Sequence, residues 1–169
     1  DNMSADELFD YISTFRSDNL FAIAELFSRN RDYFNVFKSC NAGSKSDIWC
    51  GNCPKCLFAY IILSPFIEPA VLQNIFGKDL LNDEALRLYF DQLTGKAETK
   101  PFECVGTISE VITALKLTKE RWYAVGNEPL LLQGFEPQAP YTSTTTLFSE
   151  HNLSVNELAL LKQCIEKNI

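Results

Sequence analysis

The sequence predicts a mostly α-helical domain with a four-cysteine zinc knuckle, and three observations lead to this fold class. Apolar residues recur at helical spacing through much of the chain, strand patterns are short and few, and four of the six cysteines fall in one short stretch. The chain has 169 residues, of which 46% are hydrophobic and 13 are Phe. This length and composition allow the chain to bury a core as a single domain.

The first third of the chain is predicted to be helical. The sequence Ser-Ala-Asp-Glu at 4–7 is a capping box before an apolar pattern that indicates a first helix. Ser17 or Asp18 can cap a second helix, whose apolar positions between 20 and 27 follow a helical period. Residues 33–37 are expected to form a third helical segment, which leads into the cysteine-rich stretch.

The middle of the chain contains its most apolar helix. Residues 41–47 combine Gly and Ser without periodicity, as expected of a loop that holds a metal ion. Residues 57–63 are uninterrupted by polar side chains other than one tyrosine, and they predict a buried helix that enters the core from the metal site. Pro69 can begin the next short helix, and Gly77 can end it.

Two further helices are predicted by their caps. Asn82 or Asp83 can cap a helix that ends before Gly95. The sequence Thr-Ile-Ser-Glu at 107–110 is a second capping box, and it begins a longer helix that residues 119–125 can continue.

These elements predict one helical domain with a long connection near its end. We expect residues 1–125 to form the helical zinc-bearing domain. Residues 126–152 contain three prolines, two glycines and a run of Thr and Ser, and they predict a long loop or lid. Residues 153–169 are expected to add a C-terminal helix to the same domain, capped by Ser154.

Composition and charge exclude several function classes. The formal net charge of -7 argues against general nucleic-acid binding, which needs a basic surface to displace counterions. No apolar run is long enough to span a bilayer, and the first residues lack the basic and apolar regions of a signal peptide. Overlapping Cys-x-x-Cys pairs would form strained disulfide rings, so a reducing, cytoplasmic setting is expected.

The cysteine-rich stretch predicts a metal site. Cys50, Cys53 and Cys56 are separated by two residues each, and Cys40 lies one loop upstream. Two intervening residues allow a tight turn to direct successive sulfurs at one ion, and Gly51 permits the sharp turn. Four thiolates and no nearby histidine predict a closed, structural zinc site. An iron–sulfur cluster and cysteines without metal remain as alternatives.

Residues 100–107, Lys-Pro-Phe-Glu-Cys-Val-Gly-Thr, are the second stretch with chemical potential. Gly106 and Thr107 begin a helix whose free N–H groups can hold a phosphate or a carboxylate. Cys104 directly before that helix can act as an acid, base or nucleophile, and Glu103 is a candidate general base. The alternative is that the cysteine packs inside and Thr107 only caps the helix.

Both motifs resemble those of a known enzyme family. Ser-Cys-Asn at 39–41, Trp-Cys-Gly at 49–51 and Cys-Pro-Lys-Cys at 53–56 are similar to the zinc segment of the PP-loop ATP-pyrophosphatase superfamily, as in 7-cyano-7-deazaguanine synthase. With Lys-Pro-Phe-Glu-Cys-Val-Gly at 100–106, the chain most closely resembles the ATP-dependent UDP-N-acetylmuramoyl-L-alanyl-L-glutamate epimerases. The likeness covers about residues 31–110.

The resemblance implies the zinc-bearing C-terminal part of a larger α/β PP-loop enzyme. Such an enzyme would use ATP and magnesium to adenylate the terminal L-Glu carboxylate of UDP-MurNAc-L-Ala-L-Glu, and would then invert its Cα and release AMP. The reaction serves peptidoglycan precursor synthesis. The resemblance also implies substrate contacts at Lys100, Gly106 and Thr107, with Glu103 and Cys104 as base or acid.

One motif of the superfamily is missing from this chain. The Ser-Gly-Gly-x-Asp-Ser phosphate loop is absent, so the resemblance places an N-terminal nucleotide-binding half upstream of Asp1. Without that half, the chain is expected not to bind ATP normally. Two other functions remain open: a PP-loop enzyme that modifies a nucleobase or tRNA, and a zinc-stabilised interaction module without catalysis.

Overall fold

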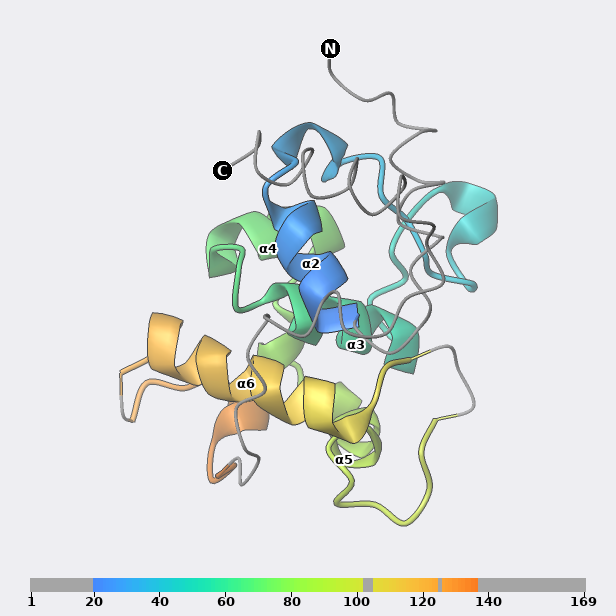
Figure 1. Ribbon diagram of the computed structural model, residues 1–169. Helices are drawn as coiled ribbons and strands as arrows, with labels where there is room; N and C mark the ends of the chain where they lie inside the picture. Colours follow the sequence, from blue (N-terminus) through green and yellow to red (C-terminus); the bar gives the residue numbers. More distant parts are fainter. Residues whose placement is uncertain (1–19, 102–104, 125, 137–169) are drawn as a thin grey trace, which may run out of the picture.

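The computed structural model describes residues 20–101, 105–124 and 126–136 (Figure 1). Within these ranges the chain is helical and contains no strand, as the sequence predicts. In chain order the elements are the α-helices and short 3-10 helices α2 (Leu20–Ser28), η2 (Arg31–Tyr33), η3 (Ser44–Ser46), α3 (Pro54–Leu63), α4 (Pro69–Phe76), η4 (Leu80–Asn82), η5 (Glu84–Leu86), α5 (Arg87–Leu93), α6 (Ile108–Trp122) and η6 (Leu130–Leu132).

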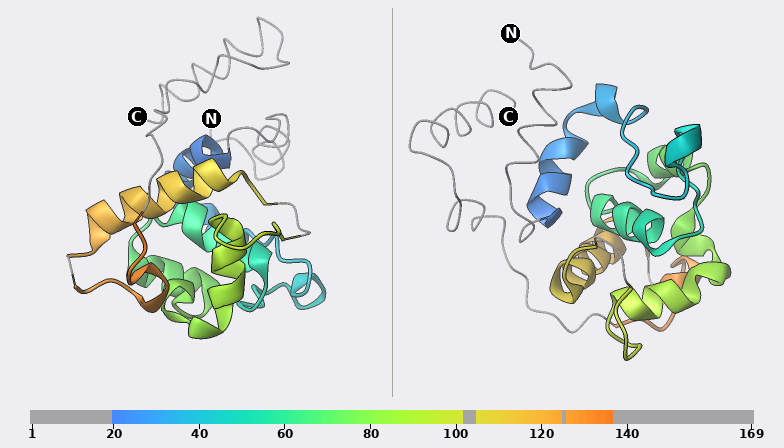
Figure 2. Two further views of the ribbon diagram at one scale, coloured as in Figure 1. Left: turned by 90° about the horizontal axis from the view of Figure 1, so that it is seen from below. Right: turned by 90° about the vertical axis from the view of Figure 1, so that its right-hand side faces the viewer.

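Helix α3 lies at the centre of the fold. All of its residues from Cys56 to Leu63 are buried, and α2, α4, α5 and α6 all contact it. Figure 2 shows these helices around α3 from two further sides. A helix that is covered on every side needs no polar face, which explains the apolar run that predicted it. None of the described helices is long and apolar enough to cross a membrane.

Polar contacts join the end of α3 to the last turns of α6. The hydroxyl oxygens of Ser64 and Thr118 lie 2.5 Å apart, and both side chains are buried. The indole of Trp122 donates to the Ser64 carbonyl oxygen over 2.7 Å, and Arg121 donates to the carbonyl oxygen of Pro65 over 3.0 Å. These bonds satisfy carbonyl groups that the end of a helix leaves without partners.

The predicted helix ends agree closely with the structure. Pro69 is the first residue of α4, and Gly77 ends that helix with a positive φ of 80°. Thr107 caps α6, which continues to Trp122. The helix expected after Asp83 differs in its first turn, which is the separate 3-10 helix η5. The Asp83 carboxylate accepts the N–H of Ala85 over 3.0 Å, and the Asp83 carbonyl oxygen accepts the N–H of Leu86 over 3.1 Å.

The segment expected to be a third helix, residues 33–37, is not an α-helix. The 3-10 helix η2 ends at Tyr33, and hydrogen-bonded turns follow it. One of these turns is closed by the N–H of Phe37, which donates to the Tyr33 carbonyl oxygen over 2.9 Å. The ring of Phe37 packs on that of Phe27 with centroids 4.8 Å apart. Packing against α2 therefore holds this short segment.

The described beginning of the predicted long connection, residues 126–136, packs into the core. Leu131 and Leu132 are fully buried. The Arg87 guanidinium at the start of α5 donates to the carbonyl oxygens of Leu130, over 2.7 Å, and of Leu131, over 3.1 Å. The first part of this connection is therefore attached to the helices by side-chain hydrogen bonds.

Other predictions fall on residues outside the described ranges. These are the first helix, which lies within 1–19, the remainder of the long loop at 137–152 and the C-terminal helix at 153–169. The division of the chain into 1–125, 126–152 and 153–169 stays a prediction.

Two apolar positions on α5 allow a matched test of the core. Phe90 is fully buried and its ring meets that of Phe135 edge-on at 5.2 Å, whereas Leu88 on the same helix is 63% exposed. We expect Phe90→Ala to lower the free energy of unfolding by about 3–5 kcal/mol, because it leaves a cavity. Leu88→Ala should change it by less than about 0.5 kcal/mol. Urea unfolding followed by circular dichroism measures both, and equal effects would contradict this core.

Candidate metal centre

Four cysteine sulfurs meet at one point in the structure. The sulfurs of Cys40, Cys50, Cys53 and Cys56 all lie within 4.8 Å of one another. Three of the separations are 3.5 Å (Cys53 to Cys56), 3.6 Å (Cys50 to Cys56) and 3.9 Å (Cys40 to Cys53). In a tetrahedral site with Zn–S bonds of about 2.3 Å, neighbouring sulfurs are about 3.8 Å apart. The four thiols therefore have the chemistry and the spacing to hold one such ion.

The loop that carries Cys40 folds back on itself at a glycine. The N–H of Gly43 donates to the Cys40 sulfur over 3.2 Å, and its carbonyl oxygen accepts the N–H of Ile48 over 3.2 Å. A Cβ added at Gly43 would lie 1.9 Å from the Ile48 carbonyl oxygen. This close approach of two backbone segments requires glycine at position 43.

Two of the other three ligands, Cys53 and Cys56, belong to the beginning of the central helix. Cys53 is the N-cap of α3, and its sulfur accepts the N–H of Cys56 over 3.4 Å. Pro54 is the first helical residue, where the missing N–H costs nothing. Gly51 has a φ of 66° and makes the sharp turn expected after Cys50. Cys56 is fully buried, so this ligand belongs to the core as well as to the metal site.

The thiols differ in their electrostatic surroundings. Burial by itself would raise the pKa of Cys40, but the backbone N–H groups of Cys50 and Gly43 outweigh it and lower the pKa to about 7. Burial raises the pKa of Cys53 to about 11, and it raises the pKa of Cys56 further. Without a cation, four neighbouring thiolates repel one another, and a bound dication would remove this conflict.

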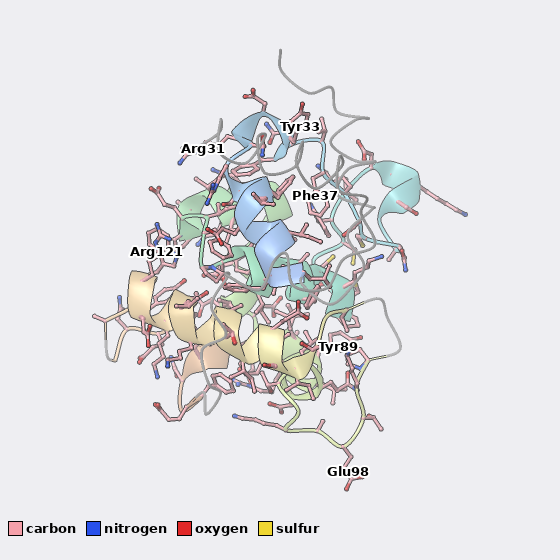
Figure 3. All side chains as sticks on the ribbon, in the orientation of Figure 1. Arg31, Tyr33, Phe37, Tyr89, Glu98 and Arg121 are labelled. Carbon is pink, nitrogen blue, oxygen red and sulfur yellow. The ribbon has the colours of Figure 1, made fainter. Side chains whose placement is uncertain are left out.

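Aromatic packing supports the turn from outside. The indole ring of Trp49 lies between the rings of Phe37 (5.4 Å) and Phe76 (4.6 Å), and the ring of Phe76 also meets that of Tyr60 on α3 (5.2 Å). Phe37, labelled in Figure 3, lies between α2 and the metal loop. The indole nitrogen of Trp49 is buried and has no hydrogen-bond partner among the residues that the structure describes. Sequence reasoning missed this support, although an aromatic residue next to a ligand cysteine was its signal.

A lysine outside the metal loop also holds the turn. Lys78 donates to the Asn52 side-chain oxygen over 2.8 Å and forms an ion pair with Asp83. Its side chain also contacts Gly51, since a Cβ added there would lie 2.9 Å from Lys78 Cε. The turn between the second and third ligands is therefore tied to the segment after α4. Sequence spacing gave no signal of this contact.

The second motif begins and ends within the described residues. Lys100 is exposed and donates to the Val105 carbonyl oxygen over 3.3 Å. Gly106 is buried against α3, because a Cβ at this position would lie 2.9 Å from Cζ of Phe58. Glu103 and Cys104 lie outside the described residues, so their proposed catalytic roles stay predictions.

The start of α6 is occupied by its own capping groups. The Glu110 carboxylate accepts the N–H of Thr107 over 2.8 Å, and the Thr107 hydroxyl accepts the N–H of Glu110 over 3.2 Å. The other Glu110 oxygen accepts the N–H of Phe21 in α2 over 3.3 Å. This geometry corresponds to the alternative in which Thr107 caps the helix. Substrate binding by Gly106 and Thr107 stays a prediction.

Comparison with known proteins identifies relatives of this chain. The family described as MurL C-terminal domain matches residues 36–146. Proteins named UDP-N-acetyl-alpha-D-muramoyl-L-alanyl-L-glutamate epimerase from Micromonospora sp. and Salinispora tropica are each 41% identical over 115 residues, and the one from Xanthomonas oryzae pv. oryzae is 38% identical over 117 residues. Each match covers 66% of this chain and 25–26% of the relative. No solved structure matches the chain.

The chain therefore spans about a quarter of the length of the curated relatives that it matches. The family match covers more than half of the chain and includes the four-cysteine cluster and residues 100–107. On this basis the chain belongs to the family of MurL C-terminal domains.

Proposed function

We propose that this chain is the C-terminal, zinc-bearing portion of an ATP-dependent epimerase that inverts the terminal L-Glu of UDP-MurNAc-L-Ala-L-Glu for peptidoglycan precursor synthesis. The observation that carries the proposal is the 38–41% identity to three proteins named as this epimerase. The family match at 36–146 includes both motifs that bear chemistry. Shared metal ligands alone would support only a shared fold.

The proposal divides the enzyme into two parts with different tasks. The relatives are about four times as long as the matched region, so most of the enzyme lies outside it. We assign ATP and magnesium to that remainder, on the PP-loop that the resemblance implies. A UDP-linked substrate and ATP both occur in the cytoplasm, which is where we place the protein.

The reaction requires a general base and a general acid, and we assign both to this portion of the enzyme. Attack of the glutamate carboxylate on the α-phosphorus of ATP releases pyrophosphate and gives an acyl-adenylate, whose Cα–H is more acidic than that of the free acid. One side chain then removes the Cα proton, another returns a proton to the opposite face, and hydrolysis releases AMP. We assign these two roles to Glu103 and Cys104. Lys100, Gly106 and Thr107 would contact the substrate.

Lys100 is suited to an anionic substrate. Its ammonium group is exposed and donates, over 3.3 Å, to the backbone carbonyl oxygen of Val105. It lies at the beginning of the motif that also contains the two proposed acid–base residues. Transfer of that ammonium to a carboxylate or phosphate oxygen would give a stronger, charge-assisted hydrogen bond.

The metal has a structural role in this proposal. Four cysteine thiolates would fill the tetrahedral positions of a zinc ion and leave none for water or substrate. The residues that would hold the ion are Cys40, Cys50, Cys53 and Cys56. Bound to one ion, these four cysteines would join the loop before Trp49 to the first turn of α3.

We expect one zinc ion per chain by elemental analysis. Because serine is a poor ligand for zinc, Cys50→Ser should lower the zinc content and the melting temperature. Binding of structural zinc contributes on the order of 10 kcal/mol in small zinc modules, so removal by a strong chelator should unfold or loosen the domain. Ser46→Ala, an exposed change in the same loop, is the control and should alter neither value. Iron together with inorganic sulfide would contradict the zinc assignment.

The activity is tested in the full-length protein with UDP-MurNAc-L-Ala-L-Glu, ATP and magnesium. Chiral analysis of glutamate after acid hydrolysis of the product should show D-Glu. Glu103→Gln and Cys104→Ala should each slow inversion by about 10²–10⁴-fold, the usual contribution of a general acid or base. Both variants should still release pyrophosphate, because adenylation precedes proton transfer.

The matched control for this experiment is Glu98→Gln. Glu98 is an exposed carboxylate in the same segment, and Figure 3 shows it pointing away from the helices. We expect this variant to invert glutamate at the unchanged rate. Unchanged rates for Glu103→Gln and Cys104→Ala would remove both residues from the mechanism. A full-length protein that makes no D-Glu would contradict the proposed function itself.

A further inference from the structure

The side chain of Lys78 lies across the turn that joins Cys50 to Cys53. A Cβ added at Gly51 would lie 2.9 Å from Lys78 Cε, so the stem of the lysine packs directly on the backbone of the turn. The ammonium group of the lysine donates to the side-chain oxygen of Asn52 over 2.8 Å. Both residues in the middle of the turn are therefore in contact with one side chain from outside the metal loop.

Lys78 is itself held in position by the residues around it. Gly77, directly before it, ends α4 with a φ of 80° and so turns the chain out of that helix. Asp79, directly after it, accepts the hydroxyl group of Tyr60 on the buried helix α3 over 3.0 Å. The ammonium group also forms an ion pair with Asp83. The lysine therefore starts from a fixed point of the fold and can hold the turn against it.

The turn lies on the more accessible side of the cysteine cluster. Cys40 and Cys56 are buried, whereas Cys50 and Cys53 are half-buried. Cys53 is the N-cap of α3 and is therefore fixed to the central helix. Cys50 lies outside that helix, and its sulfur accepts the N–H of Asn52 over 3.5 Å. Displacement of Cys50 from an ion thus requires the turn to open, but it leaves α3 in place.

We propose that Lys78 is a positioning residue that holds this turn closed over the metal site and thereby sets the rate at which bound zinc is released. Replacement of a residue that orients metal ligands typically lowers metal affinity by about 10–100-fold. The role is positional, because Asp83 supplies the counter-charge of the ammonium group. Since 40% of the Lys78 side chain is exposed, the ion pair contributes little to the stability of the fold. The inference depends on the zinc assignment and not on the proposed epimerase activity.

The test measures zinc release from the full-length protein to an excess of the chromogenic chelator 4-(2-pyridylazo)resorcinol. Lys78→Met keeps an unbranched stem over Gly51 but removes the ammonium group, and it should accelerate release by about 10–100-fold. Asn52→Ala removes the acceptor of the same hydrogen bond and should accelerate release to a similar extent. The double variant should release zinc no faster than the faster single variant, because both changes break one contact.

Two matched variants separate this role from charge and from general stability. Lys45→Met removes an exposed positive charge from the metal loop. Arg87→Met breaks the contacts of a cation on α5 with the carbonyl oxygens of Leu130 and Leu131. Neither variant should change the rate of zinc release. Cobalt-loaded Lys78→Met protein should keep the absorption bands of tetrahedral thiolate coordination, because all four ligands remain.

Several results would overturn the proposal. One is a release rate that is unchanged by Lys78→Met or by Asn52→Ala. Others are an equal acceleration by Lys45→Met or Arg87→Met, additive effects in the double variant, and loss of the tetrahedral cobalt bands. A protein that binds no zinc would also overturn it. Because Asn52 is exposed, Asn52→Ala decides the question even if Lys78→Met fails to fold.

Discussion

The joint between the metal ligands and the first turn of α3 is the constraint on which most of this structure depends. Cys53 caps the helix and Cys56 lies within its first turn, so two of the four sulfurs belong to the element at the centre of the core. The helices packed around α3 take their positions from it. An ion held by these sulfurs would thus stabilise the core as well as a surface loop, since its binding free energy contributes to folding.

The sequence predicted those elements correctly whose structure is determined by residues close to one another in the chain. The capping box at 107–110, the proline and glycine that bound α4, and the apolar run of α3 all depend on contacts within a few residues. The cysteine spacing belongs to the same class, because two-residue intervals restrict where successive sulfurs can point. Contacts between residues far apart in the sequence determine the segments that the local patterns did not predict. Residues 33–37 are held by packing against α2, and the Arg87 guanidinium reaches carbonyl groups more than forty residues away, at 130–131.

The candidate metal site also combines features that local spacing predicts with contacts that it does not predict. Spacing identified four residues that the structure brings together, but it could not show that Gly43 must approach Ile48 or that Lys78 holds the turn beside Cys50. For the start of α6, the sequence left both an anion site and a simple cap open. The structure shows the cap, and it adds a contact from Glu110 to the N–H of Phe21, which no local pattern predicts. One carboxylate thus joins the beginnings of two helices.

The contact between Gly106 and Phe58 has a consequence for how the two motifs communicate. Phe58 lies two residues after the ligand Cys56 on α3, and its ring leaves no room for a side chain at position 106. Any rotation of the first turn of α3 would move that ring against the backbone that leads into α6. The first turns of α3 and the backbone at Gly106 are therefore in van der Waals contact, without any bond between them.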